Sequence, residues 1–193
     1  MRAIKTVVYS FDELSEDAKE KAIENVRNSN FLDYDWWDCT LEDWKECLGI
    51  IGFEVENIYF NVGYSQSDYA SIEGTYKYKK QWQKALKQSG IGGKTLKALS
   101  EYGQRLQKAQ SLVFYSGYCS VSSHHRGGMC FDVEAEKGRI DEFDTDVRDI
   151  VSDICHDIYC SLTDEYEYLT SDESIREMIL CNEMEFTEEG SIA

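Results

Sequence analysis

The chain has 193 residues, 42% of them hydrophobic, with 13 Tyr, 8 Phe and 4 Trp, and it carries a formal net charge of −17. This composition argues for a folded protein despite the charge, so we expect a single domain over residues 1–193. The charge disfavours nucleic acid and anionic membranes as direct ligands and favours a partner with a basic surface.

The cysteine content indicates a reducing compartment. Seven cysteines without a C-x-x-C pair favour free thiols. No signal peptide precedes the first strand-like segment, and the uninterrupted apolar runs are too short to span a membrane. We therefore expect a cytoplasmic protein with no metal and no cofactor.

The first part of the chain predicts a strand and two helices. Residues 3–9 are rich in β-branched side chains and predict the strand. Ser15 is placed to cap a helix that runs to about Asn28. Residues 33–48 predict a second helix, which Gly49 or Gly52 ends. The expected core side of the second helix consists of Trp37, Leu41, Trp44 and Leu48.

The opposite side of this second helix carries carboxylates at i, i+3, i+7 and i+11. These residues are Asp35, Asp38, Glu42 and Glu46. Lys45 interrupts the acidic face only in part.

Residues 53–63 and 69–79 alternate apolar and polar side chains and predict a β-hairpin with a loop around Tyr64–Asp68. The alternation shifts by one residue at Glu56–Asn57, which indicates a β-bulge.

Residues 79–110 are basic and predict two helices separated by the sequence SGIGG. The expected apolar anchors are Trp82, Leu86, Leu96, Leu99 and Leu106. Residues 77–125 carry nine basic groups and one acidic group, whereas the segments on both sides are strongly acidic. The chain therefore contains a basic segment, residues 77–108, between two acidic ones.

The rest of the chain predicts a second hairpin and two helices. Residues 112–123 and 129–136 are the strands of this hairpin, and the sequence HHRGG is its turn. A helix over residues 141–160 and a last helix capped near Ser171 follow, and the sequence EMEF predicts a short edge strand. The element order indicates an α+β protein: an antiparallel sheet built from two β-hairpins plus the N-terminal strand, with helices packed on one face.

The helix over residues 141–160 has two contrasting sides. Its apolar side consists of Phe143, Val147, Ile150, Val151, Ile154 and Ile158. Its acidic stripe consists of Glu142, Asp146, Asp149, Asp153 and Asp157. These five carboxylates fall within roughly 80° of the helix surface and extend over about 22 Å. Like charges at i, i+4 cost about 0.2–0.5 kcal/mol per pair, so the stripe is either offset within the fold or binds something positive.

Two explanations of the acidic stripe remain open. The stripe could pair internally with the basic segment, or it could be a surface that binds a basic partner and mimics the charge of nucleic acid. The residues expected to bind a partner are Glu142, Asp146, Asp149, Asp153 and Asp157 on the later helix and Asp35, Asp38 and Glu42 on the earlier one.

Sequence signatures of catalysis are weak. The stretch SGIGGKT lacks the first glycine of a phosphate-binding loop and follows an amphipathic helix, so it predicts a flexible linker. His124 and His125 fit a hairpin turn better than a shared ligand site. Cys155, His156 and Cys160 do not face one direction well enough for zinc. A hydrolase built from scattered carboxylates or from the His pair stays possible, because paired carboxylates have no spacing signature.

Three segments in the first 80 residues resemble a known family. They read VVYSFDELSEDAKEKAIE, YDWWDC and IYFNVGYSQSDYASIEGTYKYKK. They are similar to small bacteriophage proteins commonly labelled "antitoxin of toxin–antitoxin stability system". In these relatives the loop reads more like YSQGDG, and Ser67 and Tyr69 stand here in place of glycine. The resemblance implies a phage or prophage origin and action in the bacterial cytoplasm.

By analogy with other small acidic phage proteins, the expected function is a non-enzymatic inhibitor of a host defence protein, of the anti-CRISPR or anti-restriction type, or of a toxin. Nucleic-acid mimicry by the acidic stripe would serve that function. One alternative is a nucleic-acid-binding module that uses the basic segment, with Tyr76, Tyr78 and Trp82 available to stack on bases. A hydrolase with an unrecognised site is the other.

Overall fold

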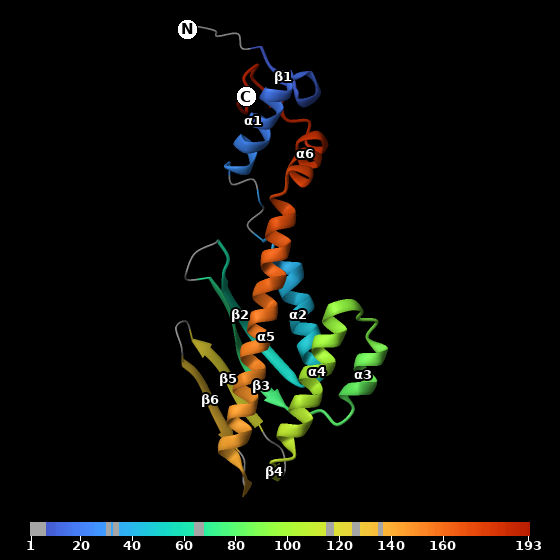
Figure 1. The fold of residues 1–193 in the computed structure, drawn as a ribbon, viewed down its shortest axis with the longest axis vertical. Helices are drawn as coiled ribbons and strands as arrows, with labels where there is room; N and C mark the ends of the chain where they lie inside the picture. Colours follow the sequence, from blue (N-terminus) through green and yellow to red (C-terminus); the bar gives the residue numbers. More distant parts are fainter. Residues whose placement is uncertain are drawn as a thin grey trace. The chain divides into compact units, whose positions relative to one another are not determined.

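The computed structural model describes residues 7–29, 32, 35–63, 68–114, 118–124, 128–134 and 137–193 (Figure 1). Within residues 114–137 it describes the backbone and not the side chains. The chain divides into two compact units. The first consists of Met1–Trp36 and Thr163–Ala193, and the second is Trp37–Leu162. Whether both units fold together as the single expected domain stays a prediction.

The described part of the first unit contains helices and a small sheet from the two ends of the chain. Its elements are β1 (Tyr9–Ser10), the 3-10 helix η1 (Phe11–Glu13), α1 (Glu16–Arg27), the end of α5 (Ile140–Leu169) from Thr163, α6 (Asp172–Cys181) and β8 (Glu185–Phe186). Both predicted helix caps are confirmed, because Ala18 N donates to Ser15 Oγ at 3.3 Å and Ser174 N donates to Ser171 Oγ at 3.3 Å. Each cap satisfies a backbone N–H group that has no partner inside its helix.

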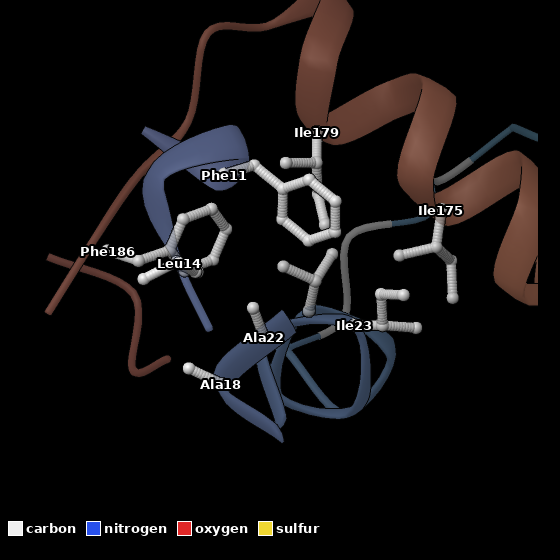
Figure 2. Close-up of a cluster of buried hydrophobic side chains, with 9 residues drawn as sticks. Phe11, Leu14, Ala18, Ala22, Ile23, Ile175, Ile179 and Phe186 are labelled. Carbon is white, nitrogen blue, oxygen red and sulfur yellow. The ribbon is translucent and has the colours of Figure 1, made fainter. Parts of the chain in front are cut away.

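A hydrophobic core holds η1, α1, α6 and β8 together (Figure 2). It consists of Phe11, Leu14, Ala18, Ala22, Ile23, Val26, Ile175, Ile179 and Phe186. The rings of Phe11 and Phe186 meet edge to face, with centroids 6.2 Å apart. The core therefore joins residues from the two ends of the chain.

The sequence predicted that the N-terminal strand joins the sheet of the two hairpins, and this prediction is wrong for its described part, β1. Residues 1–6 lie outside the described residues, and β1 pairs antiparallel with β8, with Tyr9 opposite Phe186. The reason is packing, because Phe11 and Phe186 enter the same core and bring the strands beside them together. The short edge strand predicted from EMEF is confirmed as β8.

The second unit is built on a four-stranded antiparallel sheet in the order β2-β3-β5-β6 (Figure 1). The strands are β2 (Phe53–Asn61), β3 (Tyr69–Lys77), β5 (Tyr118–His124) and β6 (Gly128–Glu134). A separate pair joins β4 (Val113–Phe114) to β7 (Lys137–Gly138). The α+β class is therefore confirmed. The loop residues 64–67 and the turn residues 125–127, including His125, lie outside the described residues.

The bulge expected at Glu56–Asn57 is confirmed by a register shift between Val55 and Asn57. The shift keeps the apolar residues of β2 and β3 on one face, where Ile58 stands opposite Ile72 and Phe53 opposite Tyr76. The ring of Trp37 lies 5.1 Å from that of Phe60, which places the start of α2 over this face.

Four helices complete the second unit. They are α2 (Asp38–Ile51), α3 (Trp82–Gln88), α4 (Gly93–Gln110) and the part of α5 (Ile140–Leu169) up to Leu162. The predicted break at SGIGG is confirmed, because residues 89–92 separate α3 from α4. Helix α5 is longer than the predicted 141–160, and its whole predicted apolar side is buried. In the described part of the chain, no helix combines the length and the apolar character needed to cross a membrane.

Helix α2 begins five residues later than predicted, after a turn that ends at Trp37. Trp44 and Leu48 are buried as expected, whereas Trp37 and Leu41 are only half-buried. Gly52 ends the helix with a φ of 111°, a backbone conformation that L side chains rarely adopt. A Cβ at Gly52 would also lie 2.3 Å from the Lys77 carbonyl oxygen, so glycine is required for two reasons.

Replacement of Gly74 tests the bulge. A Cβ at this position would lie 2.1 Å from the Glu54 carbonyl oxygen and 2.9 Å from Val55 Cα. These are backbone atoms and cannot move aside alone, so we expect Gly74→Ala to lower the free energy of unfolding by about 2 kcal/mol or more in urea titrations. Gly49→Ala is the matched control, because nothing lies within 4 Å of its added Cβ. It lies in the last turn of α2 and should be neutral or stabilising. Equal stability of both variants would contradict the prediction.

Candidate functional site

The acidic side of α2 is exposed. Asp38, Glu42 and Glu46 lie on it, and Trp44, Leu48 and Ile51 are buried on the other side. At 100° per residue the carboxylates span roughly 80° of the helix surface. Burial of the apolar side therefore fixes the direction in which the carboxylates point.

These carboxylates form no ion pair within the described residues, and Glu46 lines a hollow together with Lys79 and Lys80. Within the described ranges, no hydrogen bond or ion pair involves the side chain of Asp38, Glu42 or Glu46. Lys45, the cation in the same helix, donates to the Glu56 carbonyl oxygen at 3.2 Å instead. Asp35 is also exposed, and it belongs to the other unit. The acidic face of α2 therefore consists of Asp38, Glu42 and Glu46.

Some carboxylates of the acidic stripe on α5 have partners within the protein, and others do not. Asp153 Oδ2 lies 2.5 Å from Arg105 Nη1, and Asp157 accepts a 2.7 Å hydrogen bond from the Tyr102 hydroxyl. Both partners come from α4, so this end of the stripe faces the protein itself. Glu142 pairs with Arg139 three residues earlier, at 2.8 Å.

The middle of the stripe has no such partner. Among the residues that the structure describes, neither Asp146 nor Asp149 forms an ion pair or hydrogen bond through its side chain. Arg148, the cation nearest in sequence, pairs with Asp144 at 2.8 Å instead. Asp149 is exposed and Asp146 is partly exposed. These two carboxylates therefore remain available to a partner.

Tyr102 is buried with its hydroxyl directed at a carboxylate. Burial raises the pKa of Tyr102 far above its ordinary value, and the hydrogen bond to Asp157 raises it further. The neutral phenol is therefore the form that the fold stabilises. Together with Arg105, it joins α4 to α5 across a small hollow of about 310 Å³.

The basic segment is mostly not neutralised by the acidic stripe. In the part of the chain with described side chains, Arg105 is its one member in an ion pair. The remaining members are exposed lysines, namely Lys77, Lys79, Lys80, Lys84, Lys87, Lys94, Lys97 and Lys108. Lys79 donates to the Gly49 carbonyl oxygen at 2.5 Å. Among the described side chains, pairing with the basic segment therefore involves one end of the stripe, and it leaves Asp146, Asp149 and the exposed lysines outside ion pairs.

The aromatic residues expected to stack on bases are placed differently from the prediction. Tyr76 is 0% exposed and Trp82 is 3% exposed, so neither ring can receive a base. Tyr76 packs on Phe53 within the sheet, and Trp82 packs on Gly103 of α4. The reason is that the apolar side of the hairpin and of α3 needs large side chains to fill the core. Tyr78 is half-buried.

The remaining sequence motifs are the SGIGGKT stretch, the histidine pair and the cysteines of α5. SGIGGKT follows the helix α3, not a strand, which confirms a helix–helix linker. His124 ends β5 and pairs with Gly128 at the start of β6, which confirms the hairpin. His156 Nε2 lies 3.6 Å from Cys160 Sγ, while Cys155 is buried. Within the described residues, no group of three or more His, Cys, Asp or Glu side chains could hold a metal ion.

One polar cluster has no counterpart in the sequence analysis. Asn57 Nδ2 and the Tyr59 hydroxyl both donate to Glu73 Oε2, each at 3.0 Å, on the face of the hairpin away from the core. The hydrogen bond to Glu73 raises the pKa of Tyr59. Cross-strand pairing of Asn57 with Glu73 could have been predicted from the register, once the bulge was placed. Tyr102 was also missed, although its i, i+3 spacing to Arg105 places both on one side of a helix.

The chain matches the model of a protein family described as "Domain of unknown function (DUF8835)" over residues 36–172. This match covers most of the chain, so the protein belongs to that family. The matched residues include α2, α3, α4 and all of α5, and thus the acidic face of α2 and the acidic stripe. No curated protein and no solved structure matches the chain.

Removal of the Tyr102 hydroxyl tests the contact between α4 and α5. We expect Tyr102→Phe to lower the free energy of unfolding at neutral pH by about 1 kcal/mol, because Asp157 loses its hydrogen bond. The folded-state pKa of Tyr102 is raised, so this contribution is fully present below pH ~10 and is lost as the pH rises further. The difference between wild type and variant should therefore shrink above pH ~10 in urea titrations at several pH values.

Tyr168→Phe is the control for this measurement, because Tyr168 is 63% exposed. Its stability should follow that of the wild type at every pH. A difference between wild type and Tyr102→Phe that stays constant up to the alkaline limit of the titration would show that Tyr102 is not held neutral by the fold.

Proposed function

We propose that this protein is a non-enzymatic inhibitor of phage origin that binds a basic surface on a host defence protein or a toxin. The observation that carries the proposal is the acidic face of α2, three exposed carboxylates that form no ion pair in the described part of the chain. The net charge of −17 favours a basic partner. Action in the bacterial cytoplasm follows from the resemblance to small phage proteins.

The energetics of the helix support a binding role for this face. Like charges at i, i+4 destabilise a helix by about 0.2–0.5 kcal/mol per pair, and Asp38, Glu42 and Glu46 form two such pairs. Asp38 is favoured by the helix dipole because it lies in the first turn, but Glu42 and Glu46 have no such compensation. A basic partner would remove this repulsion on binding.

The acidic stripe supplies a second element of the proposed interface. Asp146 and Asp149 are the members that a partner could reach without competition from this protein's own cations. Asp153 and Asp157 already serve α4, so they are weaker candidates than the sequence suggested. Exposed carboxylates at helical spacing can mimic the phosphates that a nucleic-acid-binding protein recognises, and association would then be fast and sensitive to salt.

The test begins with capture of partners from a bacterial lysate by the immobilised full chain, at low and at high salt. A partner retained at low salt is purified, and its dissociation constant is measured for the wild type and two double variants. We expect Glu42→Lys with Glu46→Lys to weaken binding at least tenfold, which is about 1.4 kcal/mol. Asp146→Lys with Asp149→Lys tests the stripe in the same way.

Glu177→Lys with Glu188→Lys is the matched control, because it changes the net charge equally on exposed residues of the first unit. It should bind within about twofold of the wild type. Circular dichroism confirms that each variant is folded. If both acidic double variants and their combination bind the partner as the wild type does, neither helix face is the interface and the proposal fails.

The alternative of a nucleic-acid-binding module rests on the exposed lysines of the basic segment. Two of the three aromatic residues that this alternative needs for base stacking, Tyr76 and Trp82, are buried. We therefore expect no shift of single-stranded or duplex DNA or of RNA in a mobility-shift assay at low salt. Binding that weakens steeply with salt and disappears in Lys84→Glu with Lys87→Glu would establish this alternative instead.

A further inference from the structure

Helices α3 and α4 enclose a groove of about 770 Å³ within the second unit. One side of α4 forms a wall with residues at i, i+3, i+4, i+7, i+8 and i+11, and one side of α3 forms the other. The residues of the α4 wall are Gly93, Leu96, Lys97, Ser100, Glu101 and Gln104. The α3 wall consists of Trp82, Gln83, Leu86 and Lys87. This volume lies in the usual range of ligand-binding clefts.

The floor of the groove is apolar. The six-membered ring of Trp82 packs on Gly103, where an added Cβ would lie 2.5 Å from a ring carbon. Gly103 therefore allows α3 to approach α4 closely, and Trp82 and Leu86 are buried between them. Leu96 was expected in the core and instead is 37% exposed at the groove.

The groove lies in the most basic part of the protein. Lys87 and Lys97 line it from opposite helices, and neither forms an ion pair among the described residues. Lys84 and Lys94 are exposed on the same two helices. Glu101 is the one acidic residue between positions 77 and 125. The groove thus combines an apolar floor with basic margins in a protein that is otherwise strongly acidic.

We propose that this groove binds an acidic amphipathic helix of a partner protein, whose apolar side chains contact Leu96 and the floor while its carboxylates face Lys87 and Lys97. An amphipathic helix in a groove is a common mode of peptide recognition, read through apolar anchors at i, i+3, i+4 and i+7. Charge complementarity sets the sign of this partner. Lys97 and Glu101 also line the hollow that Asp153 and Asp157 of α5 border, whereas Lys87 and Leu96 line the groove alone. The inference is argued from the lysines and Leu96 and not from the acidic face of α2, so it does not depend on the proposed function.

A helical peptide fits the groove better than nucleic acid does. Nucleic acid gains affinity from phosphate contacts and from stacking on exposed aromatic rings. The aromatic residue of the groove, Trp82, is buried and offers no exposed ring on which a base could stack. An apolar side chain at Leu96 adds nothing to phosphate binding, whereas it is a suitable contact for leucine or phenylalanine.

The experiment uses the full chain and a fluorescein-labelled peptide of about five helical turns, composed of Leu, Ala and Glu with Leu at i, i+3, i+4 and i+7. Binding is followed by fluorescence anisotropy at low salt. The same peptide with Lys in place of Glu and a labelled oligothymidylate are the comparison probes. We expect saturable binding of the acidic peptide and none of the basic peptide.

Two variants test the groove itself. Lys87→Glu with Lys97→Glu should weaken binding of the acidic peptide at least tenfold, and Leu96→Gln should weaken it about fivefold, because a leucine contact is lost. Lys21→Glu with Arg176→Glu is the matched control, since it changes the net charge equally on exposed residues of the first unit. This control should bind within about twofold of the wild type.

Three outcomes would overturn the proposal. The first is absence of binding at low salt. The second is equal affinity for oligothymidylate and peptide with no effect of Leu96→Gln, which would show a purely electrostatic surface. The third is concentration-dependent self-association, measured by sedimentation, that Lys87→Glu with Lys97→Glu abolishes, because the occupant would then be an acidic surface of a second copy of the chain.

Discussion

Burial of one side of α5 is the constraint on which the second unit depends. Phe143, Val147, Ile150, Val151, Ile154, Ile158 and Leu162 are each no more than 1% exposed. Removal of this much apolar surface from water fixes the rotation of the helix about its axis. The rotation then decides the side of α5 on which each carboxylate of the acidic stripe lies, because the helix backbone fixes the direction of every Cα–Cβ bond. Asp153 and Asp157 are turned toward α4, and Asp146 and Asp149 are not.

The charges of the protein are separated in sequence and remain separated in the structure. Surface ion pairs contribute at most about 1 kcal/mol each, so the fold gains little by joining the basic segment to the acidic stripe. The bond between Asp153 and Arg105 is such a pair, with half and a third of the two side chains exposed. The remaining charges form two surfaces of opposite sign in the second unit, the acidic face of α2 and the basic groove between α3 and α4. Interaction surfaces of this kind act more on association rate and choice of partner than on stability.

Two glycines allow neighbouring parts of the second unit to pack more closely than a side chain would permit. Gly74 lets the backbone of β2 lie close to β3 beside the bulge, and Gly103 lets the Trp82 ring lie against α4. Neither glycine has a positive φ, so neither is required by its own backbone conformation. Their role is to leave space for a neighbour, and a single sequence gives no indication which neighbour that is. The floor of the groove depends on this placement, because the Trp82 ring is buried against Gly103.

The sequence by itself determined the elements whose cause is local. Side-chain periodicity predicted both hairpins, the bulge, the buried side of α5 and the break before α4, and capping serines predicted the starts of α1 and α6. Tertiary structure alone decided the pairing of β1 with β8, the burial of Tyr76 and Trp82, the exposure of Leu96 and the division of the acidic stripe. These features depend on contacts between residues far apart in the chain, such as Phe11 with Phe186 or Tyr102 with Asp157. Periodicity shows which side of a helix or strand is apolar, but competition for space in the core selects which apolar residue is buried.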